Sequence, residues 1–210
     1  MSRLSELMEE MCPDGVEYVP IKEKYTRLRG TPITALKMRE IENADGNIIV
    51  YAGGKTVVNA FEHDIPNANI TRVPAVIVQS RGIVDFIYCD RPCTFKNELW
   101  AYTCDEKISV KFLYYVLKNN AEYFRKIASQ MGAMPQISLS VTEDFLVPMP
   151  PLPVQAEIVR ILDKWADAHN GLIALLEAEL ADRKKQYAYY LDKLLTFTPK
   201  EKDKHVARTL

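Results

Sequence analysis

The feature that most constrains this fold is an apolar stripe near the end of the chain, where hydrophobic residues recur every three or four positions. The stripe consists of Ile158, Ile161, Leu162, Trp165, Leu172, Leu175, Leu176, Leu180, Tyr187, Leu191 and Leu194. The spacing predicts one long helix. Such a helix of about 40 residues extends roughly 60 Å, more than a single domain of ordinary size covers. The stripe therefore needs a partner helix.

Two features mark the limits of this helix. Asn170 and Gly171 lie in its middle and cost about 1 kcal/mol of helix stability, so a kink or a break into two helices stays open. Before it lies a proline-rich joint, 147–153, which we expect to be extended and to separate two domains. The predicted domains are 1–150 and the helix 151–198, followed by a mixed-charge tail, 199–210, that we expect to be disordered.

The first domain has short runs of β-branched and aromatic residues separated by Gly, Pro, Asn and Asp, which is typical of strands. These runs are 48–51, 56–58, 75–78 and 86–88. A short helix is predicted around Leu4–Met11, and a second over 109–128 with Ser109 as its cap. The predicted fold class is α+β, a mixed, strand-rich domain followed by a long helix of coiled-coil type.

Composition narrows the function. Hydrophobic residues make up 48% and charged residues 26% of the 210 residues, as in globular proteins, and the net charge is -1. A chain with this charge is no indiscriminate polyanion binder, so any contact with nucleic acid must rest on a local basic patch. With no apolar run of about 18 residues and no signal-peptide pattern, we expect a cytoplasmic protein without a membrane partner.

Catalytic and metal-binding patterns are weak. The histidines, His63, His169 and His205, are isolated in the sequence, and no nucleophile motif accompanies them. The cysteines, Cys12, Cys89, Cys93 and Cys104, lack zinc-site spacing, and we interpret them as reduced, mostly buried thiols. We predict no catalytic residue, no metal and no cofactor of the chain's own.

Three segments resemble the DNA specificity subunit of type I restriction-modification systems. They are Cys12–Tyr18, Met131–Ser138 and, most specifically, Val147–Val159, where a proline-rich stretch leads into the helix. The resemblance implies a target recognition domain followed by a spacer helix. Family members of full length carry two such units with antiparallel helices, whereas this sequence holds one, so it resembles a half subunit.

The resemblance also implies partners. Two copies would dimerise through the apolar stripe of the long helix, and the antiparallel homodimer would bind a bipartite, palindromic site on double-stranded DNA. Methyltransferase subunits would supply S-adenosylmethionine chemistry on adenine, and a restriction subunit with motor and nuclease activity could join them. The alternatives are the specificity module of a related restriction enzyme outside type I, or a non-catalytic helical scaffold protein.

The best candidate for DNA contact is the segment 20–39, which has six basic residues and one acidic residue. In it Arg27, Arg29 and Thr31 flank Gly30, whose bare backbone would permit close approach to a phosphate or base. The alternative is an ordinary solvated basic loop. A later turn, Gly53–Thr56, ends like a nucleotide-binding loop but lacks its first glycine. We expect it either to present Lys55 and Asn59 to DNA or to be a plain hairpin turn.

The remaining candidates lie in polar segments that follow predicted strands. Gln79, Ser80 and Arg81 come directly after the run 75–78, and side chains at strand ends often bind ligands. Arg81 could bind guanine and Gln79 adenine through paired hydrogen bonds, although Arg81 could instead form a structural salt bridge. Lys96, Asn97 and Gln136 complete the set, and the first two could equally be turn residues.

Overall fold

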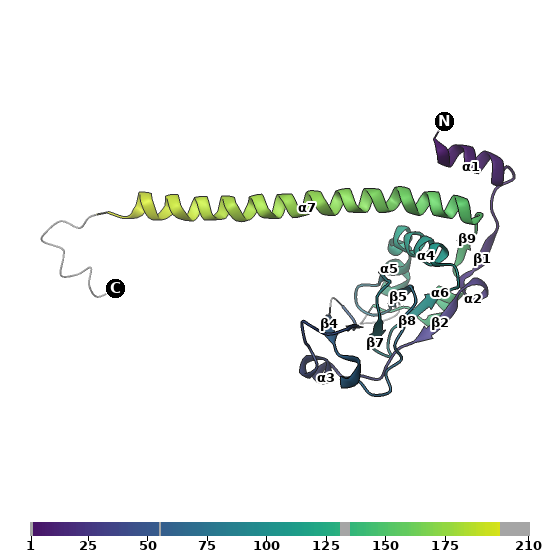
Figure 1. The fold of residues 1–210 in the computed structure, drawn as a ribbon, viewed down its shortest axis with the longest axis horizontal. Coiled ribbons are helices and arrows are strands. Elements are labelled where there is room, and N and C mark those ends of the chain that lie inside the picture. Colours follow the sequence, from purple (N-terminus) through teal and green to yellow (C-terminus); the bar gives the residue numbers. More distant parts are fainter. Residues whose placement is uncertain (1, 55, 131–134, 198–210) are drawn as a thin grey trace, which may run out of the picture. The chain divides into compact units, whose positions relative to one another are not determined.

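The computed structural model describes residues 2–54, 56–130 and 135–197 (Figure 1). Its helices are α1 (Arg3–Met11), α2 (Ile21–Lys24), α3 (Ala35–Glu40), the 3-10 helix η1 (Glu62–Asp64), α4 (Lys107–Asn119), α5 (Ala121–Ser129), α6 (Leu139–Glu143) and α7 (Leu152–Leu195). Its strands are β1 (Tyr18–Pro20), β2 (Thr26–Arg29), β3 (Ile48–Tyr51), β4 (Val57–Ala60), β5 (Ala75–Gln79), β6 (Asp85–Cys89), β7 (Cys93–Phe95), β8 (Trp100–Thr103) and β9 (Leu146–Pro148). Mixed α+β architecture with a long C-terminal helix is confirmed.

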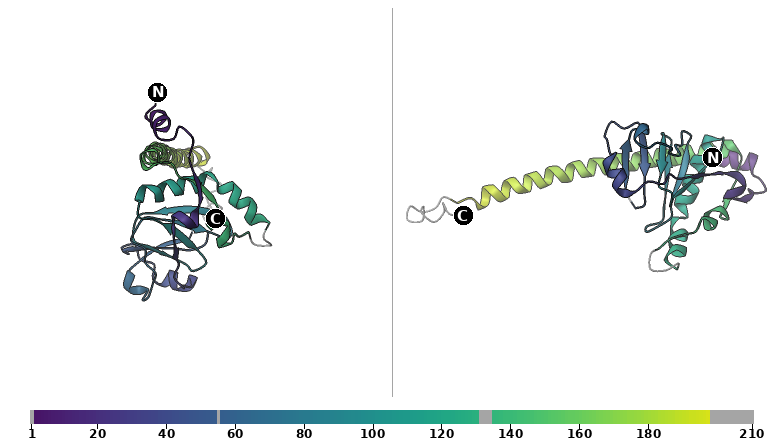
Figure 2. Two further views of the ribbon diagram at one scale, coloured as in Figure 1. Left: turned by 90° about the vertical axis from the view of Figure 1, so that its right-hand side faces the viewer. Right: turned by 90° about the horizontal axis from the view of Figure 1, so that it is seen from below.

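The chain divides into two compact units, one up to Leu162 and one from Asp163 onward. The first unit contains a four-stranded antiparallel sheet in the order β2-β8-β5-β6 and a three-stranded sheet in the order β4-β3-β7. In the smaller sheet β3 pairs antiparallel with β4 and parallel with β7. Figure 2 gives two further views of these sheets.

The first unit is layered because its central strands are apolar on both faces. In β5, Val76 and Val78 pack with residues of α4 and α5, whereas Ala75 and Ile77 face the core between the two sheets. β3 continues the pattern, since alternate residues face that core and a third cluster that includes residues of α3. Alternation along a strand thus puts helices, two sheets and α3 into successive layers.

Two segments on which the family resemblance rests meet in a small sheet. β1 pairs antiparallel with β9, with Tyr18 opposite Pro148, and the Met149 amide donates a hydrogen bond to the Glu17 carbonyl at 2.8 Å. The chain therefore returns beside its own start just before α7. Proline is tolerated in such a two-stranded edge because half of the backbone groups need no partner in the sheet.

Several local predictions need correction. Residues 26–29 form strand β2, which was not among the strands predicted from the sequence. The helix predicted over 109–128 starts earlier, at Lys107, and is interrupted at Asn120. Ser109 does not cap it: its hydroxyl is buried and donates to Gln155 Oε1 at 2.9 Å.

The proline-rich joint is shorter than predicted, because its first residues belong to β9 and its last to α7. α7 begins at Leu152, and the Pro151 carbonyl accepts from the Val154 and Gln155 amides. Pro153 fits the first turn of this helix, where its missing N–H is not needed. The helix runs through Asn170 and Gly171 without a break.

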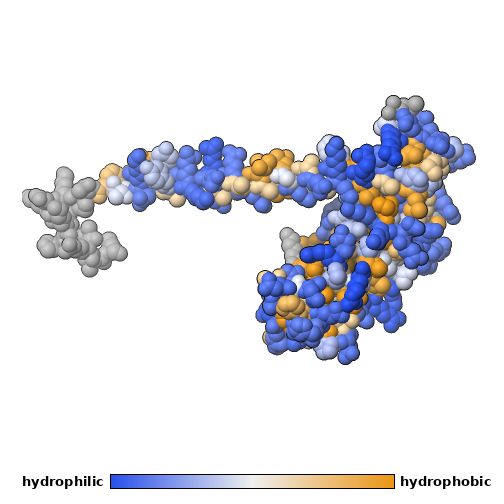
Figure 3. All heavy atoms as spheres, in the orientation of Figure 1, coloured by the Kyte–Doolittle hydropathy of each residue, from blue (hydrophilic) through white to orange (hydrophobic). Residues whose placement is uncertain are grey.

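The stripe on α7 has two environments. Ile158, Ile161 and Leu162 are half-buried and belong to the first unit. From Trp165 on, the stripe is exposed: 71% for Trp165 and Leu175, 56% for Leu172 and 57% for Leu176. Hydrophobic patches are visible along this part of the helix in Figure 3. The tail 199–210 lies outside the described residues.

Candidate nucleic-acid interface

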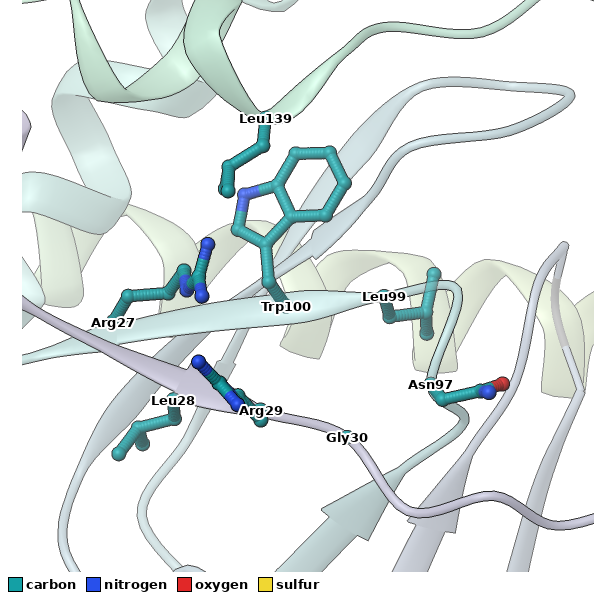
Figure 4. A pocket seen from close by; sticks show the side chains of 8 residues that line it. All are labelled: Arg27, Leu28, Arg29, Gly30, Asn97, Leu99, Trp100 and Leu139. Atoms are coloured by element: carbon teal, nitrogen blue, oxygen red, sulfur yellow. The ribbon is translucent and has the colours of Figure 1, made fainter.

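Two arginines of β2 border a cleft of about 300 Å³. Alternation in the strand puts Arg27 and Arg29 on one face and Leu28 on the other, where Leu28 packs against the core between the sheets (Figure 4). Arg29 lies opposite Trp100 of β8 in the sheet. The whole lining is Arg27, Leu28, Arg29, Gly30, Asn97, Leu99, Trp100 and Leu139.

The two arginines of this cleft differ in whether an acidic side chain lies beside them. Arg27 Nη1 lies 3.7 Å from Glu143 Oε1, and both side chains are about one-third exposed. Arg29 and Asn97 are exposed, and among the described residues no acidic side chain pairs with Arg29. The indole N–H of Trp100 donates to Thr142 Oγ1 at 3.0 Å, which holds the ring in place on the cleft wall beside Leu139 (Figure 4).

A second cleft, of about 280 Å³, shares Trp100 and Leu139 with the first and brings in Arg81 and Gln136. These two residues form an isolated antiparallel bridge, next to a hydrogen bond of 2.8 Å from the Gly82 amide to the Pro135 carbonyl. Arg81 is exposed, and the structural salt bridge that we considered for it does not form with any described residue. The sequence predictions for Arg81 and Gln136 thus concern one site.

A third cleft, of about 470 Å³, shares Glu98 with the second and includes Arg39 of α3 and Lys96. Lys96 is paired with Glu98 at 2.9 Å. Because neighbouring clefts share lining residues, they adjoin one another and have a continuous lining, which also includes the carboxylates of Glu42 and Glu98. We call its cations the basic face: Arg27, Arg29, Arg39, Arg81 and Lys96.

Three predicted contact residues do not point to solvent. Thr31, Gln79 and Ser80 are 3%, 6% and 2% exposed. Thr31 Oγ1 lies 2.7 Å from Thr94 Oγ1 and accepts from the Asn69 amide at 2.9 Å. Since their polar groups are engaged inside the domain, we withdraw all three as direct DNA contacts.

Gly30 also has a different role from the one predicted. A Cβ at this position would lie 2.4 Å from the Lys96 carbonyl oxygen and 2.7 Å from that of Phe95. The bare backbone therefore makes room for the β7–β8 loop and not for a phosphate or a base. This close approach brings the ends of β2 and β7 together, with the Thr31 amide donating to the Phe95 carbonyl at 2.7 Å.

The remaining candidates are scattered. Asn59 is exposed on β4 and does not line these clefts. Lys55 and the motif residues 131–134 lie outside the described residues. Sequence reasoning did not single out Arg39 within the basic segment 20–39, and it missed Trp100 and Leu139. The only signal for Trp100 would have been its place opposite Arg29, which requires the strand register.

Other chemistry is limited in the described part of the chain. No cluster of three or more His, Cys, Asp or Glu side chains there could hold a metal ion. Cys89 and Cys93 are buried between the sheets, where a hydrogen bond with Cys93 lowers the pKa of Cys89. No helix among the described residues is long and apolar enough to cross a membrane.

Comparison with protein families matches residues 27–182 to the type I restriction modification DNA specificity domain. The specificity subunit of the Escherichia coli type I restriction enzyme EcoR124I/EcoR124II is 31% identical over 161 residues, which cover 70% of this chain and 40% of that protein. The specificity subunit of the E. coli type I restriction enzyme EcoprrI is 41% identical over 99 residues, covering 44% and 24%.

Solved structures agree in fold. The S subunit of the type I restriction-modification system from M. genitalium superposes with a TM-score of 0.62 at 19% identity, over 93% of this chain and 50% of that one. A chain from a structure of type I R-M system assembly and conformational transition gives 0.59 at 20% identity, over 90% and 50%. The chain thus spans about half of these structures and less than half of the two E. coli relatives.

Proposed function

Because the chain belongs to the family of type I restriction-modification DNA specificity domains, we propose that it binds double-stranded DNA in a sequence-specific manner and directs partner subunits to that sequence. The observation that carries the proposal is the series of three adjoining clefts, whose linings contain cations from four segments of the chain. Phosphate contacts from such cations position a protein on DNA, and base contacts then provide specificity.

In this proposal the residues that line the clefts make different kinds of contact with DNA. Arg29 and Arg39 have no described acidic partner, so they are suited to phosphates. Arg81 can present its guanidinium to guanine O6 and N7, and the amides of Asn97 and Gln136 can bind adenine. Trp100 supplies an apolar wall against which a thymine methyl group or a sugar can pack.

We also propose that α7 joins two copies of the chain. The exposed leucines, tryptophan and tyrosine of the stripe have no cover among the described residues of one chain, and an apolar stripe of this spacing suits a second helix. The family resemblance supplies the antiparallel sense. A two-fold symmetric pair would bind two identical half-sites, that is, a palindrome with an unread spacer.

Catalysis belongs to the partners in this proposal. Methyltransferase subunits would flip the target adenine out of the duplex and methylate it with S-adenosylmethionine. A restriction subunit could join the same assembly. The chain itself contributes the choice of sequence and the distance between half-sites.

The test combines the chain with its methyltransferase subunits, S-adenosylmethionine and a DNA library with randomised sequence, and maps N6-methyladenine. We expect methylation at an interrupted palindrome that is lost when the chain is omitted or carries Arg29→Glu and Arg81→Glu. The matched control is Arg91→Glu, which changes an exposed arginine beyond Cys89, at the opposite end of β6 from the Gln79–Asp85 pair. A stable complex without motif-directed methylation would contradict the proposal, and no complex at all would favour a scaffold protein.

A further inference from the structure

The end of β5 lies where the second and third clefts meet, yet its side chains face inward. Gln79 Nε2 donates to the Gly54 carbonyl at 2.6 Å, which attaches the β3–β4 turn. Ser80 Oγ donates to the Glu98 carbonyl at 2.9 Å, which attaches the β7–β8 loop. Two consecutive residues therefore join two loops to one strand.

A third segment is attached at the same point. The Ile137 amide donates to the Ser80 carbonyl at 2.9 Å, beside the bridge between Arg81 and Gln136. The segments that carry Asn97 and Gln136 are thus tied to Ser80, next to Arg81. The Gln79 tie holds the β3–β4 turn, whose Gly53 and Thr56 line the third cleft. Each tie is a hydrogen bond and not an apolar contact, so its geometry is directional.

The strand that bears these ties is a buried, central strand of its sheet. β5 is buried along its whole length and pairs with β8 on one side and β6 on the other. A buried polar side chain is costly unless it is hydrogen-bonded. Arrangements of the loops that left the amide of Gln79 or the hydroxyl of Ser80 unpaired would therefore be disfavoured, and one arrangement is selected.

We propose that Gln79 and Ser80 are positioning residues for base discrimination: they do not touch DNA, but set the relative placement of the loops that do. The inference rests on the proposed function and deepens it. Base recognition needs its side chains held within about 0.5 Å of the productive geometry. Loops released from β5 would still present their cations to phosphates, but would discriminate bases poorly at several positions at once.

The experiment uses Gln79→Met, which keeps the length of the side chain and removes the donor, and Ser80→Ala. The matched control is Thr103→Val. Thr103 Oγ1 donates to the Pro74 carbonyl at 2.7 Å, so the control removes the same kind of bond from the same sheet. It does so at the opposite end of β5, beyond the Val76–Tyr102 pair.

Each variant is assembled with the methyltransferase subunits and assayed on a library with randomised half-sites. We expect Gln79→Met and Ser80→Ala to lower discrimination about tenfold at two or more positions, and Thr103→Val to leave the motif unchanged. By contrast, the contact variant Arg81→Gln should relax one position.

Three outcomes would overturn the inference alone: an unchanged motif, relaxation at a single adenine position, which indicates direct contact, or equal relaxation with Thr103→Val, which indicates general destabilisation. A wild-type assembly that methylates no motif would instead refute the proposed function and the inference with it.

Discussion

Replacing Leu172 and Leu176 with glutamate should dissociate the proposed dimer. The two side chains are 56% and 57% exposed in the single chain, so about half of each remains to be buried by a partner helix. Full burial of a leucine contributes about 1.5–3 kcal/mol, so the exposed half contributes about 1 kcal/mol. Two-fold symmetry doubles each substitution, so four side chains give roughly 4 kcal/mol before the cost of burying carboxylates. The dimer should weaken roughly a thousandfold.

Sedimentation velocity over a concentration series measures this change. The control is Ala174→Glu with Ala178→Glu, which adds the same charges at the same spacing, but on the opposite side of the helix by 100° per residue. Leucine and glutamate have similar helix propensities, and replacing alanine by glutamate costs only roughly a few tenths of a kcal/mol per site, so neither pair should unfold α7. A dimer that survives the leucine changes, or that both pairs disrupt equally, would refute the interface.

Three further outcomes follow from the first unit. Gly30→Ala should cost about 3 kcal/mol in urea unfolding, because its Cβ would lie 2.4 Å from a backbone oxygen, while Gly53→Ala, whose nearest neighbour is 3.9 Å away, should be nearly neutral. Arg81→Gln should cost about 1–3 kcal/mol of cognate DNA binding in a titration, and equal loss on every sequence would argue against base contact. The pKa of Glu157 is lowered by hydrogen bonds from Arg160, so its stabilisation is present at neutral pH and lost as the pH falls below its ordinary pKa of 4.5. Glu157→Gln should flatten the acid side of the stability curve, and an unchanged curve would contradict that assignment.

The elements that the sequence predicted well are those whose pattern is local. The period of α7 persists over 44 residues, and strand β5 is a continuous apolar run, so each is visible without its neighbours. β2 was missed because a run of Thr, Arg, Leu and Arg has no local apolar pattern. Its strand character comes from pairing with β8, more than 70 positions further along the chain.

The candidate site was predictable in residue type and less so in orientation. Gln79 follows an apolar strand and was expected to face DNA, but its amide finds the Gly54 carbonyl 25 positions earlier in the chain. Nothing local to Gln79 specifies that partner. Trp100 was missed for the converse reason: its run resembles a buried strand, and only the register with Arg29 places it on a cleft wall.

The chain has a net charge of -1, so its affinity for DNA depends on a few local cations. Pairing through α7 would double the number of these cations. On the basic face Arg27 and Lys96 have acidic partners, which leaves Arg29, Arg39 and Arg81 without one among the described residues. Because Arg81 is assigned to a base, Arg29 and Arg39 remain for phosphates. Each neutralised phosphate contributes about -0.9 to the slope of log affinity against log salt, so one copy should give roughly -2 and two copies roughly -4.

A single copy therefore has few cations that can bind phosphates at physiological salt. Pairing of two copies doubles that number. The dimer-breaking glutamates on α7 lie outside the basic face, yet they should reduce the salt slope by about half in a filter-binding titration. Equal slopes for the wild type and this variant would show that one copy makes all the phosphate contacts, and that the helix contributes nothing to affinity for DNA.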